Sequence, residues 1–392
     1  MTELYTPRAP VDRRIPLTSD LLRAGSGIAV RNVGAGSTPS RSSFDHYRFN
    51  SIAYVREKLG MEPWRGVTGC TCSARDPHSH PGQAEVLEAY DLVMRQQFER
   101  EDLEAGRIKP EQLTVYNPDK PIRIWFRVPG GHSTGKSCLE AMIACHFFDV
   151  YVPSVVSILA PKADQAKEQT LQEIKNLRAG RGLPGDVQDR VIKGPLMTGD
   201  AEDPNIRGAK HYIRTVAASN EGGKGGARLQ GMHEEHQLIV LDEVEGIPER
   251  VKMPVRSWLA DGKGIILLSL NPESRSHWSY TFRDDPAVMS MTLSSLYHPN
   301  VIHGRTIVRG VQRSFVEELL PRCKQVDRHD RGRLTFELPW MPGTIWEPDD
   351  VFSFRVLGEA PMNLTRRSLV SPAAFEAARK RGDECSTARE AA

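Results

Sequence analysis

Long apolar runs, a strong net charge and an apolar amino-terminal segment are all absent from this sequence. No run approaches the roughly 18 apolar residues that a membrane-spanning helix needs, so we expect no membrane protein. The net charge of +2 excludes the overall basicity of a histone-like DNA coat, and any contact with nucleic acid must come from local patches. Residues 1–20 lack the apolar core of a signal peptide, and the six cysteines show no regular pairing, which favours a reducing compartment. The 392 residues fit one sizeable catalytic domain with tails.

A complete phosphate-binding loop stands between a predicted strand, Ile122–Val128, and a helix expected to begin near Cys138. In such a loop the glycines let the backbone N–H groups face the phosphates. Lys136 is expected to reach the β- and γ-phosphates, and the Ser137 hydroxyl to bind Mg²⁺. A glycine-rich turn without a ligand is the weaker alternative, because the flanking strand and helix come in addition to the motif. The loop residues are Gly130, Gly131, His132, Ser133, Thr134, Gly135, Lys136 and Ser137.

A second motif ends in two carboxylates. Residues 236–243 form an aliphatic run that ends in two carboxylates, Asp242 and Glu243. This is the pattern of a parallel strand that is covered on both faces. Asp242 would then lie beside the phosphate loop and hold Mg²⁺, directly or through water, while Glu243 polarises the attacking water. Taken alone, the two acids would also suit a solvated helix start.

Along the chain, residues 1–43 are rich in Arg, Ser, Pro and Gly and are predicted to be a disordered arm, either solvated or in contact with DNA or a partner. Two helices are predicted over Tyr47–Leu59 and Gln83–Ile108. Strands and helices then alternate, which predicts an α/β fold: a parallel sheet with helices on both faces, as in RecA/ASCE-like P-loop NTPases. The helix after the phosphate loop is expected to end at Val150. The other predicted elements are helix Ala163–Arg178 and strands Val155–Ala160, Tyr212–Ala217, Leu238–Leu241 and Ile265–Leu270.

Three further segments carry polar groups beside these elements. Lys162, just after the second strand, suits a nucleic-acid phosphate contact or an ordinary turn. Asn271 follows the strand from Ile265 and suits a γ-phosphate sensor that couples hydrolysis to movement, or a simple Asn-Pro turn. Arg228 opens a charged stretch before the acidic strand, with glycines at 222, 223, 225 and 226.

These motifs together resemble the ATPase domain of the large terminase subunit of tailed phages and prophages. The resemblance covers roughly residues 47–380 and includes the phosphate loop, residues 228–248, Leu-Asn-Pro at 270–272 and Leu-Tyr-His-Pro-Asn-Val at 296–301. It implies a motor that uses ATP hydrolysis to push double-stranded DNA through a portal into a procapsid. The implied partners are the portal protein, the small terminase subunit and further copies of the chain, and the implied location is the host cytoplasm, transiently at the portal.

The resemblance also implies roles for matched residues. Lys136 and Ser137 would hold phosphate and Mg²⁺, Asp242 would help to place the metal, and Glu243 would activate water. Asn271 would belong to the coupling motif. Gln83 matches the family's adenine-reading glutamine, and a neighbouring copy would supply an arginine finger, for which the candidates are Arg228, Arg250 and Arg275.

One departure from the family concerns its nuclease domain, which binds two metals through clustered aspartates. Residues 355–361 resemble the segment that leads into that domain, but only a short helix, Pro372–Arg381, is predicted before Ala392. Asp349 and Asp350 are too few for a two-metal site. We therefore expect an ATPase domain over residues 44–345, a linker over 346–392 and no nuclease activity, with the nuclease encoded separately or lost by truncation.

A second departure is a Cys-Thr-Cys and His-Ser-His pair of motifs. Two thiolates and two imidazoles form the ligand set of a tetrahedral zinc site, although their spacing differs from the common arrangement. A polar loop without metal is the alternative. The four residues are Cys70, Cys72, His78 and His80.

The sequence thus predicts an ATP-hydrolysing, DNA-translocating motor domain that uses Mg²⁺. One alternative function with the same fold is a helicase or DNA-repair ATPase. It is disfavoured because no second RecA-like lobe with its own arginine motif is recognisable. An alternative of another class is a nucleotide-binding switch that does not hydrolyse the nucleotide. Such a switch needs no water-activating carboxylate, so Glu243 distinguishes the two.

Overall fold

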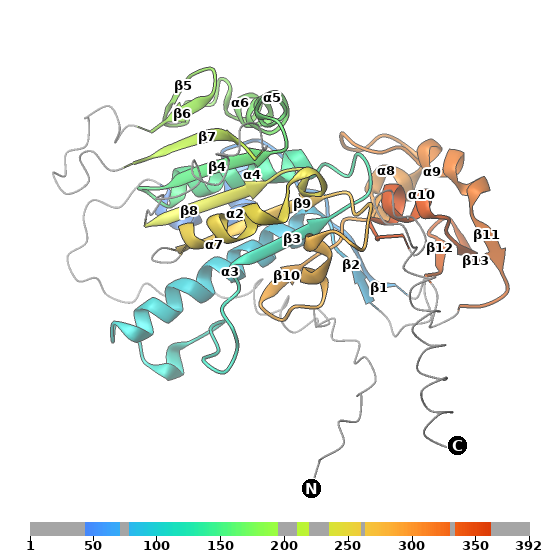
Figure 1. Cartoon of the computed structure of the whole chain (residues 1–392), viewed down its shortest axis with the longest axis horizontal. Helices are drawn as coiled ribbons and strands as arrows, with labels where there is room; N and C mark the ends of the chain where they lie inside the picture. Colours follow the sequence, from blue (N-terminus) through green and yellow to red (C-terminus); the bar gives the residue numbers. More distant parts are fainter. Residues whose placement is uncertain are drawn as a thin grey trace, which may run out of the picture. The chain divides into compact units, whose positions relative to one another are not determined.

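The largest sheet of the computed structural model has eight strands in the order β10-β3-β9-β8-β4-β7-β6-β5 (Figure 1). Neighbouring strands from β10 to β7 are parallel, whereas β7, β6 and β5 pair antiparallel. The predicted fold class is confirmed. The strands are β3 Trp125–Pro129, β4 Val155–Ala160, β5 Asp186–Val187, β6 Val191–Lys193, β7 Tyr212–Ala217, β8 His236–Leu241, β9 Lys263–Leu270 and β10 Val288–Ser290.

The structure describes residues 44–70, 78–194, 210–218, 235–259, 263–329 and 334–361. All of them belong to one unit, Ser37–Ala392. The predicted arm over residues 1–43 and the predicted helix Pro372–Arg381 lie outside the described residues. Within the described part, no helix is long and apolar enough to cross a membrane.

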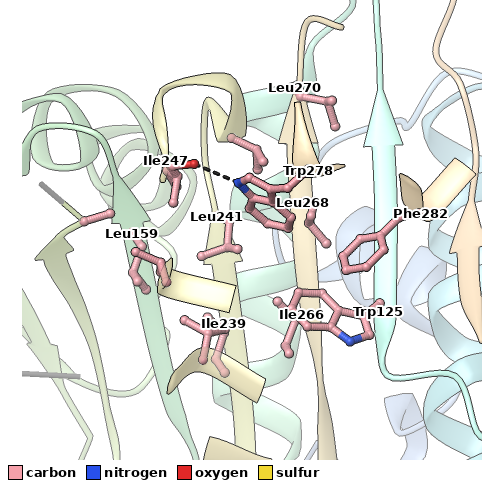
Figure 2. Packing of buried hydrophobic residues seen from close by; sticks show 14 of the residues in the cluster. Trp125, Leu159, Ile239, Leu241, Ile247, Ile266, Leu268, Leu270, Trp278 and Phe282 are labelled. Atoms are coloured by element: carbon pink, nitrogen blue, oxygen red, sulfur yellow. Dashed lines mark hydrogen bonds between the residues drawn. The ribbon is translucent and has the colours of Figure 1, made fainter. Parts of the chain in front are cut away.

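Both faces of the central parallel strands, β3, β9, β8 and β4, are buried. Ile239 and Leu241 of β8 pack beside Ile266 and Leu268 of β9 on one face, together with residues 244–259 (Figure 2). That segment contains α7 (Lys252–Trp258), and its Ile247 C=O accepts a 2.8 Å hydrogen bond from Trp278 Nε1. The alternate strand residues are buried as well, and α4 (Lys136–Val150) packs against β4, β8 and β9. Burial on both faces explains the continuous apolar runs of these strands.

The helix after β4 has three parts. It begins as α5 (Ala163–Ala166), passes through a π-helical turn, η3 (Lys167–Leu171), and ends as α6 (Gln172–Arg178). The predicted helix Ala163–Arg178 is confirmed in its bounds, but the π-helical turn was not predicted. Both η3 and α6 pack against α4, so this helix lies beside the helix that follows the phosphate loop.

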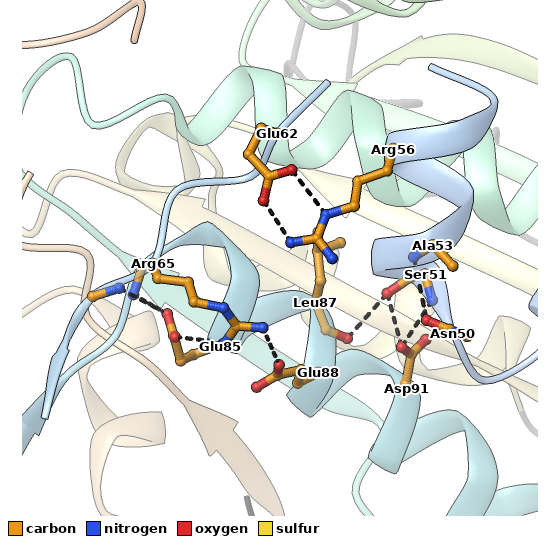
Figure 3. Close-up of polar contacts among 12 residues, drawn as sticks. Asn50, Ser51, Ala53, Arg56, Glu62, Arg65, Glu85, Leu87, Glu88 and Asp91 are labelled. Carbon is orange, nitrogen blue, oxygen red and sulfur yellow. Dashed lines mark hydrogen bonds and ion pairs between the residues drawn. The ribbon is translucent and has the colours of Figure 1, made fainter. Parts of the chain in front are cut away.

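Two amino-terminal helices, α2 (Ser51–Glu57) and α3 (Gln83–Glu104), pack together (Figure 3). The Ser51 backbone N–H and hydroxyl each donate a 2.9 Å hydrogen bond to Asp91 Oδ2. At the start of α3, Glu85 Oε2 accepts from the Gly82 N–H at 2.8 Å, which fixes the first turn. Both helices are shorter than predicted: residues 45–47 form a separate 3₁₀ turn, and α3 ends four residues before Ile108.

A second, smaller core lies around an antiparallel sheet with the order β11-β13-β12. Its strands are β11 Lys324–Val326, β12 Phe336–Leu338 and β13 Met341–Glu347. Phe352 and Val356 belong to this core, so the chain after β13 folds back onto it. The predicted boundary at residue 345 falls inside β13. The associated helices are α8 Pro299–His303, α9 Arg313–Leu319, α10 Asp350–Phe352 and the π-helical turn η11 Ser353–Leu357.

Candidate active site

Three neighbouring strands bring the predicted chemistry to one edge of the sheet. The phosphate loop follows β3, Asn271 follows β9, and Asp242 and Glu243 follow β8. Because β9 lies between β3 and β8 and all three are parallel, their carboxyl ends meet. The phosphate-loop strand and the acidic strand are thus separated by one strand, β9.

The phosphate loop has an unusual backbone. Gly135, at φ +82°, and Ser133, at φ +55°, both adopt the left-handed region, and α4 begins directly afterwards at Lys136. A non-glycine residue in that region costs about 1–3 kcal/mol and is found most often at functional sites. Gly131 is required for another reason: a methyl group there would collide with Ser295 Oγ and with the Val356 carbonyl.

Groups from distant segments hold the carbonyl oxygens of the loop. Trp64 Nε1 donates to Thr134 O at 3.3 Å, and Gln83 Nε2 donates to Gly135 O at 3.0 Å. The Val311 N–H donates to Ser133 O at 2.9 Å, and Ser295 Oγ donates to His132 O at 3.0 Å. These bonds hold the carbonyls of residues 132–135 from outside the loop, which keeps their oxygens directed away from it.

The carboxyl-terminal segment of the described chain also contacts the loop. The His132 N–H donates a 2.7 Å hydrogen bond to the Arg355 carbonyl of η11. A Cβ on Gly358, which has φ +69°, would lie 2.9 Å from Gly130 Cα. Backbone therefore packs directly on backbone here, and a shift of η11 would move the loop.

Lys136 and Asn271, which lie 135 residues apart in sequence, are direct partners. Lys136 Nζ donates to Asn271 Oδ1 at 2.6 Å and to the Gly131 carbonyl at 2.9 Å. Burial lowers the pKa of Lys136 to about 8, although the nearby Glu140, Asp242 and Glu243 act in the opposite direction. The Lys136 ammonium group therefore lies in the loop and donates to two uncharged acceptors, the Asn271 amide oxygen and the Gly131 carbonyl.

The two acids after β8 differ in environment. Asp242 is 3% exposed, and its Oδ2 accepts a 2.8 Å hydrogen bond from Thr170 Oγ1. Burial raises the pKa of Asp242, and the Thr170 hydrogen bond partly offsets this. Glu243 is exposed and has φ +49°, so it is the second strained non-glycine residue at this edge. The two adjacent acids therefore differ: Asp242 is buried against Thr170, and Glu243 faces solvent.

Glu140 is a third acid at this edge that the sequence analysis missed. It lies on α4, is 1% exposed, and its Oε2 is 3.1 Å from Thr170 Oγ1. Burial and the charge of Asp242 raise the pKa of Glu140 well above its usual range. The available signal was a single acid, one turn after Ser137, among the apolar residues of a predicted helix.

Gln83 is buried at the start of α3, and the protein uses both ends of its amide. Its Nε2 donates to Gly135 O, and its Oε1 accepts a 3.4 Å hydrogen bond from the Trp64 N–H. In this structure the side chain therefore supports the phosphate loop. Its predicted role in reading adenine stays a prediction.

The candidate arginine fingers have different surroundings. Arg228 lies outside the described residues. Arg250 is exposed in the 3₁₀ turn Glu249–Val251. Arg275 donates to the Ala360 carbonyl of the same chain at 3.3–3.4 Å. Lys162, the predicted nucleic-acid contact, is exposed after β4.

Three of the four predicted zinc ligands, Cys70, His78 and His80, lie on an antiparallel pair of strands, β1 (Val67–Cys70) and β2 (His78–His80), with Cys70 opposite His78. Cys70 Sγ lies 3.8 Å from the Tyr297 hydroxyl, and the His80 ring stacks on the Tyr297 ring at 3.5 Å. Cys72 lies outside the described residues. The described residues contain no group of three or more His, Cys, Asp or Glu side chains that could hold a metal, and the four-ligand zinc site stays a prediction.

The residues at the loop nevertheless fit Mg²⁺ bound together with a nucleotide. Mg²⁺ takes six oxygen ligands and usually keeps several waters, with one or two protein groups and phosphate oxygens completing the shell. Ser137, partly buried at the start of α4, and the Asp242 carboxylate are the protein oxygens available for this.

No protein-family model and no curated protein matches this sequence. Among solved structures, the large terminase of a thermophilic bacteriophage matches 53% of this chain and 46% of its own, with 14% identity and a TM-score of 0.38. The large terminase ATPase domain of a Thermus phage matches over 53% and 88%, with 18% identity and a TM-score of 0.34. The match with the first of these thus spans less than half of that protein. Large terminases, which the motifs resemble, are among the similar structures, but TM-scores below 0.5 carry no assignment of function.

Proposed function

We propose that this chain is a Mg²⁺-dependent ATPase of the large-terminase type, whose hydrolysis moves double-stranded DNA. The observation that supports it best is the meeting of three strand ends, where Lys136 contacts Asn271 next to Asp242 and Glu243. Two strained non-glycine residues, Ser133 and Glu243, lie at this edge. Strain at two motif positions favours a site that performs chemistry over a glycine-rich turn.

In the proposed reaction the triphosphate lies in the loop, against its N–H groups and the amino-terminal end of α4. Lys136 then exchanges the neutral amide of Asn271 for phosphate oxygens, so Asn271 is released when the γ-phosphate arrives. Ser137 and Asp242 would hold Mg²⁺, which offsets phosphate charge when bound. Glu243, which is exposed after β8, orients a water molecule and takes its proton as the water attacks the γ-phosphorus. The bond between the γ-phosphorus and the oxygen that bridges it to the β-phosphate breaks, and ADP and inorganic phosphate are released.

DNA, the portal protein, the small terminase subunit and neighbouring copies of the chain are the proposed partners, in the host cytoplasm at the procapsid portal. The exposed Lys162 follows β4 and is suited to a DNA phosphate. Arg250 is exposed and suited to reach a neighbouring copy, whereas Arg275 is bonded within its own chain. We therefore favour Arg250 over Arg275 as the arginine finger.

Phosphate release from ATP and Mg²⁺ tests this proposal. The purified chain should hydrolyse ATP, and double-stranded DNA should stimulate it. Lys136→Ala should abolish turnover and weaken ATP binding, because the charge at the β- and γ-phosphates is lost. Lys120→Ala, which removes an exposed lysine away from the loop, is the matched control and should behave as the wild type. ATP binding without release would instead indicate a nucleotide switch, and single-stranded DNA as the better activator would indicate a helicase or repair ATPase.

A further inference from the structure

Thr170 joins two buried acids at the proposed active site. It lies in the π-helical turn η3 and is 0% exposed. Its Oγ1 is 2.8 Å from Asp242 Oδ2 and 3.1 Å from Glu140 Oε2. The three side chains come from three elements: the helix after β4, the end of β8 and α4. Thr170 belongs to none of the sequence motifs described above.

The geometry gives this hydroxyl a specific task. A threonine hydroxyl donates one hydrogen, and the shorter contact identifies Asp242 as its acceptor. Since Asp242 is almost fully buried, Oδ2 would lose a needed donor without Thr170. Thr170 therefore fixes which way the Asp242 carboxylate faces.

The helix that carries Thr170 begins beside an exposed residue. Its first residue, Ala163, follows the exposed Lys162, two residues after the end of β4. Its buried residues include Ala166, Thr170, Leu171 and Ile174, so the π-helical turn directs two successive side chains, Thr170 and Leu171, inward. π-Helical turns inside helices occur frequently at functional sites.

We propose that Thr170 is a positioning residue: its hydroxyl holds Asp242 in the orientation that binds Mg²⁺ with nucleotide, and links that orientation to the helix Ala163–Arg178. The inference rests on the proposed function. Groups that orient a metal ligand typically contribute 10–100-fold to metal affinity. Loss of the hydroxyl should therefore raise the Mg²⁺ requirement, while the contacts of Lys136 with phosphate remain.

The test is a calorimetric titration of ADP and ATP at several Mg²⁺ concentrations and in EDTA. Thr170→Val should raise the half-saturating Mg²⁺ concentration about tenfold or more and leave the affinity in EDTA unchanged. Thr170→Ser, which keeps the hydroxyl, should remain near the wild type. Thr335→Val is the matched control, because it removes another buried threonine hydroxyl, bonded to His329 in the smaller core region.

Two results would overturn the inference. Wild-type Mg²⁺ dependence in Thr170→Val is one, and an equal loss of affinity with and without Mg²⁺, as expected of a merely structural residue, is the other. If the valine variant does not fold, Thr170→Ala provides the same comparison. If the wild-type chain itself binds no nucleotide, the proposed function fails, and this outcome is distinct from a failure of the Thr170 inference.

Discussion

Lys136 shows, at the scale of a single residue, how the proposed site would receive phosphate. Its ammonium is bonded to an amide oxygen and a carbonyl, both uncharged. Three acids lie near enough to affect its charge, but burial dominates and lowers its pKa to about 8. A buried ammonium with neutral partners gains from an arriving anion more than a well-solvated ammonium would.

ATP affinity should therefore depend on pH above neutrality. The pKa of Lys136 lies below its ordinary value, so the lysine is charged at pH 7 and mostly neutral at pH 9. Since the triphosphate favours the charged form, binding above pH 8 must take up a proton. The Kd for ATP should rise about tenfold between pH 7 and pH 9. Calorimetry in buffers of different ionisation enthalpy checks the proton uptake, and an affinity independent of pH over this range would contradict the account.

Gln83→Ala should separate two roles for that side chain. Because both ends of the amide are bonded to backbone, its loss should loosen the phosphate loop, at a cost of about 1–3 kcal/mol per unsatisfied group. We expect KM to rise by a similar factor for ATP and GTP. A loss of the preference for ATP over GTP, with little change for GTP, would instead assign Gln83 to adenine reading.

At the scale of elements, the parallel strands were the most predictable part. The bounds of β4 agree with the prediction, because a strand buried on both faces needs a nearly continuous apolar run with clear ends. The bounds of β7 agree as well, although only Ile213 of that strand is fully buried. The strand β3 begins three residues later than Ile122, since residues 122–124 are only partly buried. The strands β10, β11 and β12 have only three residues each, too few for a periodicity to indicate them. The longer β13 contains Pro342 and Gly343, which also obscure a strand pattern.

Residues of the candidate site could be predicted from the sequence only where they belong to a local motif. The loop, Asn271, Asp242 and Glu243 follow strands whose carboxyl ends must meet in a parallel sheet. Thr170 and the loop-holding groups of Trp64 and Ser295 come from other segments. Their roles depend on packing between distant elements, which no spacing in the sequence encodes.

The contact between η11 and the phosphate loop can be tested with two glycines. Both Gly358, at φ +69°, and Gly343, at φ +85°, are in the left-handed region, so alanine at either position costs about 1–2 kcal/mol in strain. At Gly343 no atom lies within 4 Å of the added carbon, whereas at Gly358 it meets the Gly130 backbone. Both variants should lower the melting temperature, but only Gly358→Ala should raise the KM for ATP. Equal KM values in the two variants would show that η11 does not support the loop.

At the scale of the whole molecule, the described chain combines one mostly parallel sheet with a smaller core that reaches back to the phosphate loop. In the proposed motor, ATP binding at the sheet edge must change the structure of a surface that contacts DNA or a neighbouring copy. Two routes lead away from the site: the helix Ala163–Arg178 through Thr170, and η11 through the His132 N–H. Both connections can serve the proposed motor only if the site hydrolyses ATP.

Glu243→Gln therefore tests the central claim most directly. Glutamine keeps the size of the side chain but cannot accept the proton of the attacking water, and it removes none of the hydrogen bonds of Lys136. ATP affinity, measured by calorimetry, should stay within about twofold of the wild type, while single-turnover hydrolysis falls about 10²- to 10⁴-fold. A variant that binds ATP and hydrolyses it at the wild-type rate would contradict the assignment of Glu243 and the active site built around it.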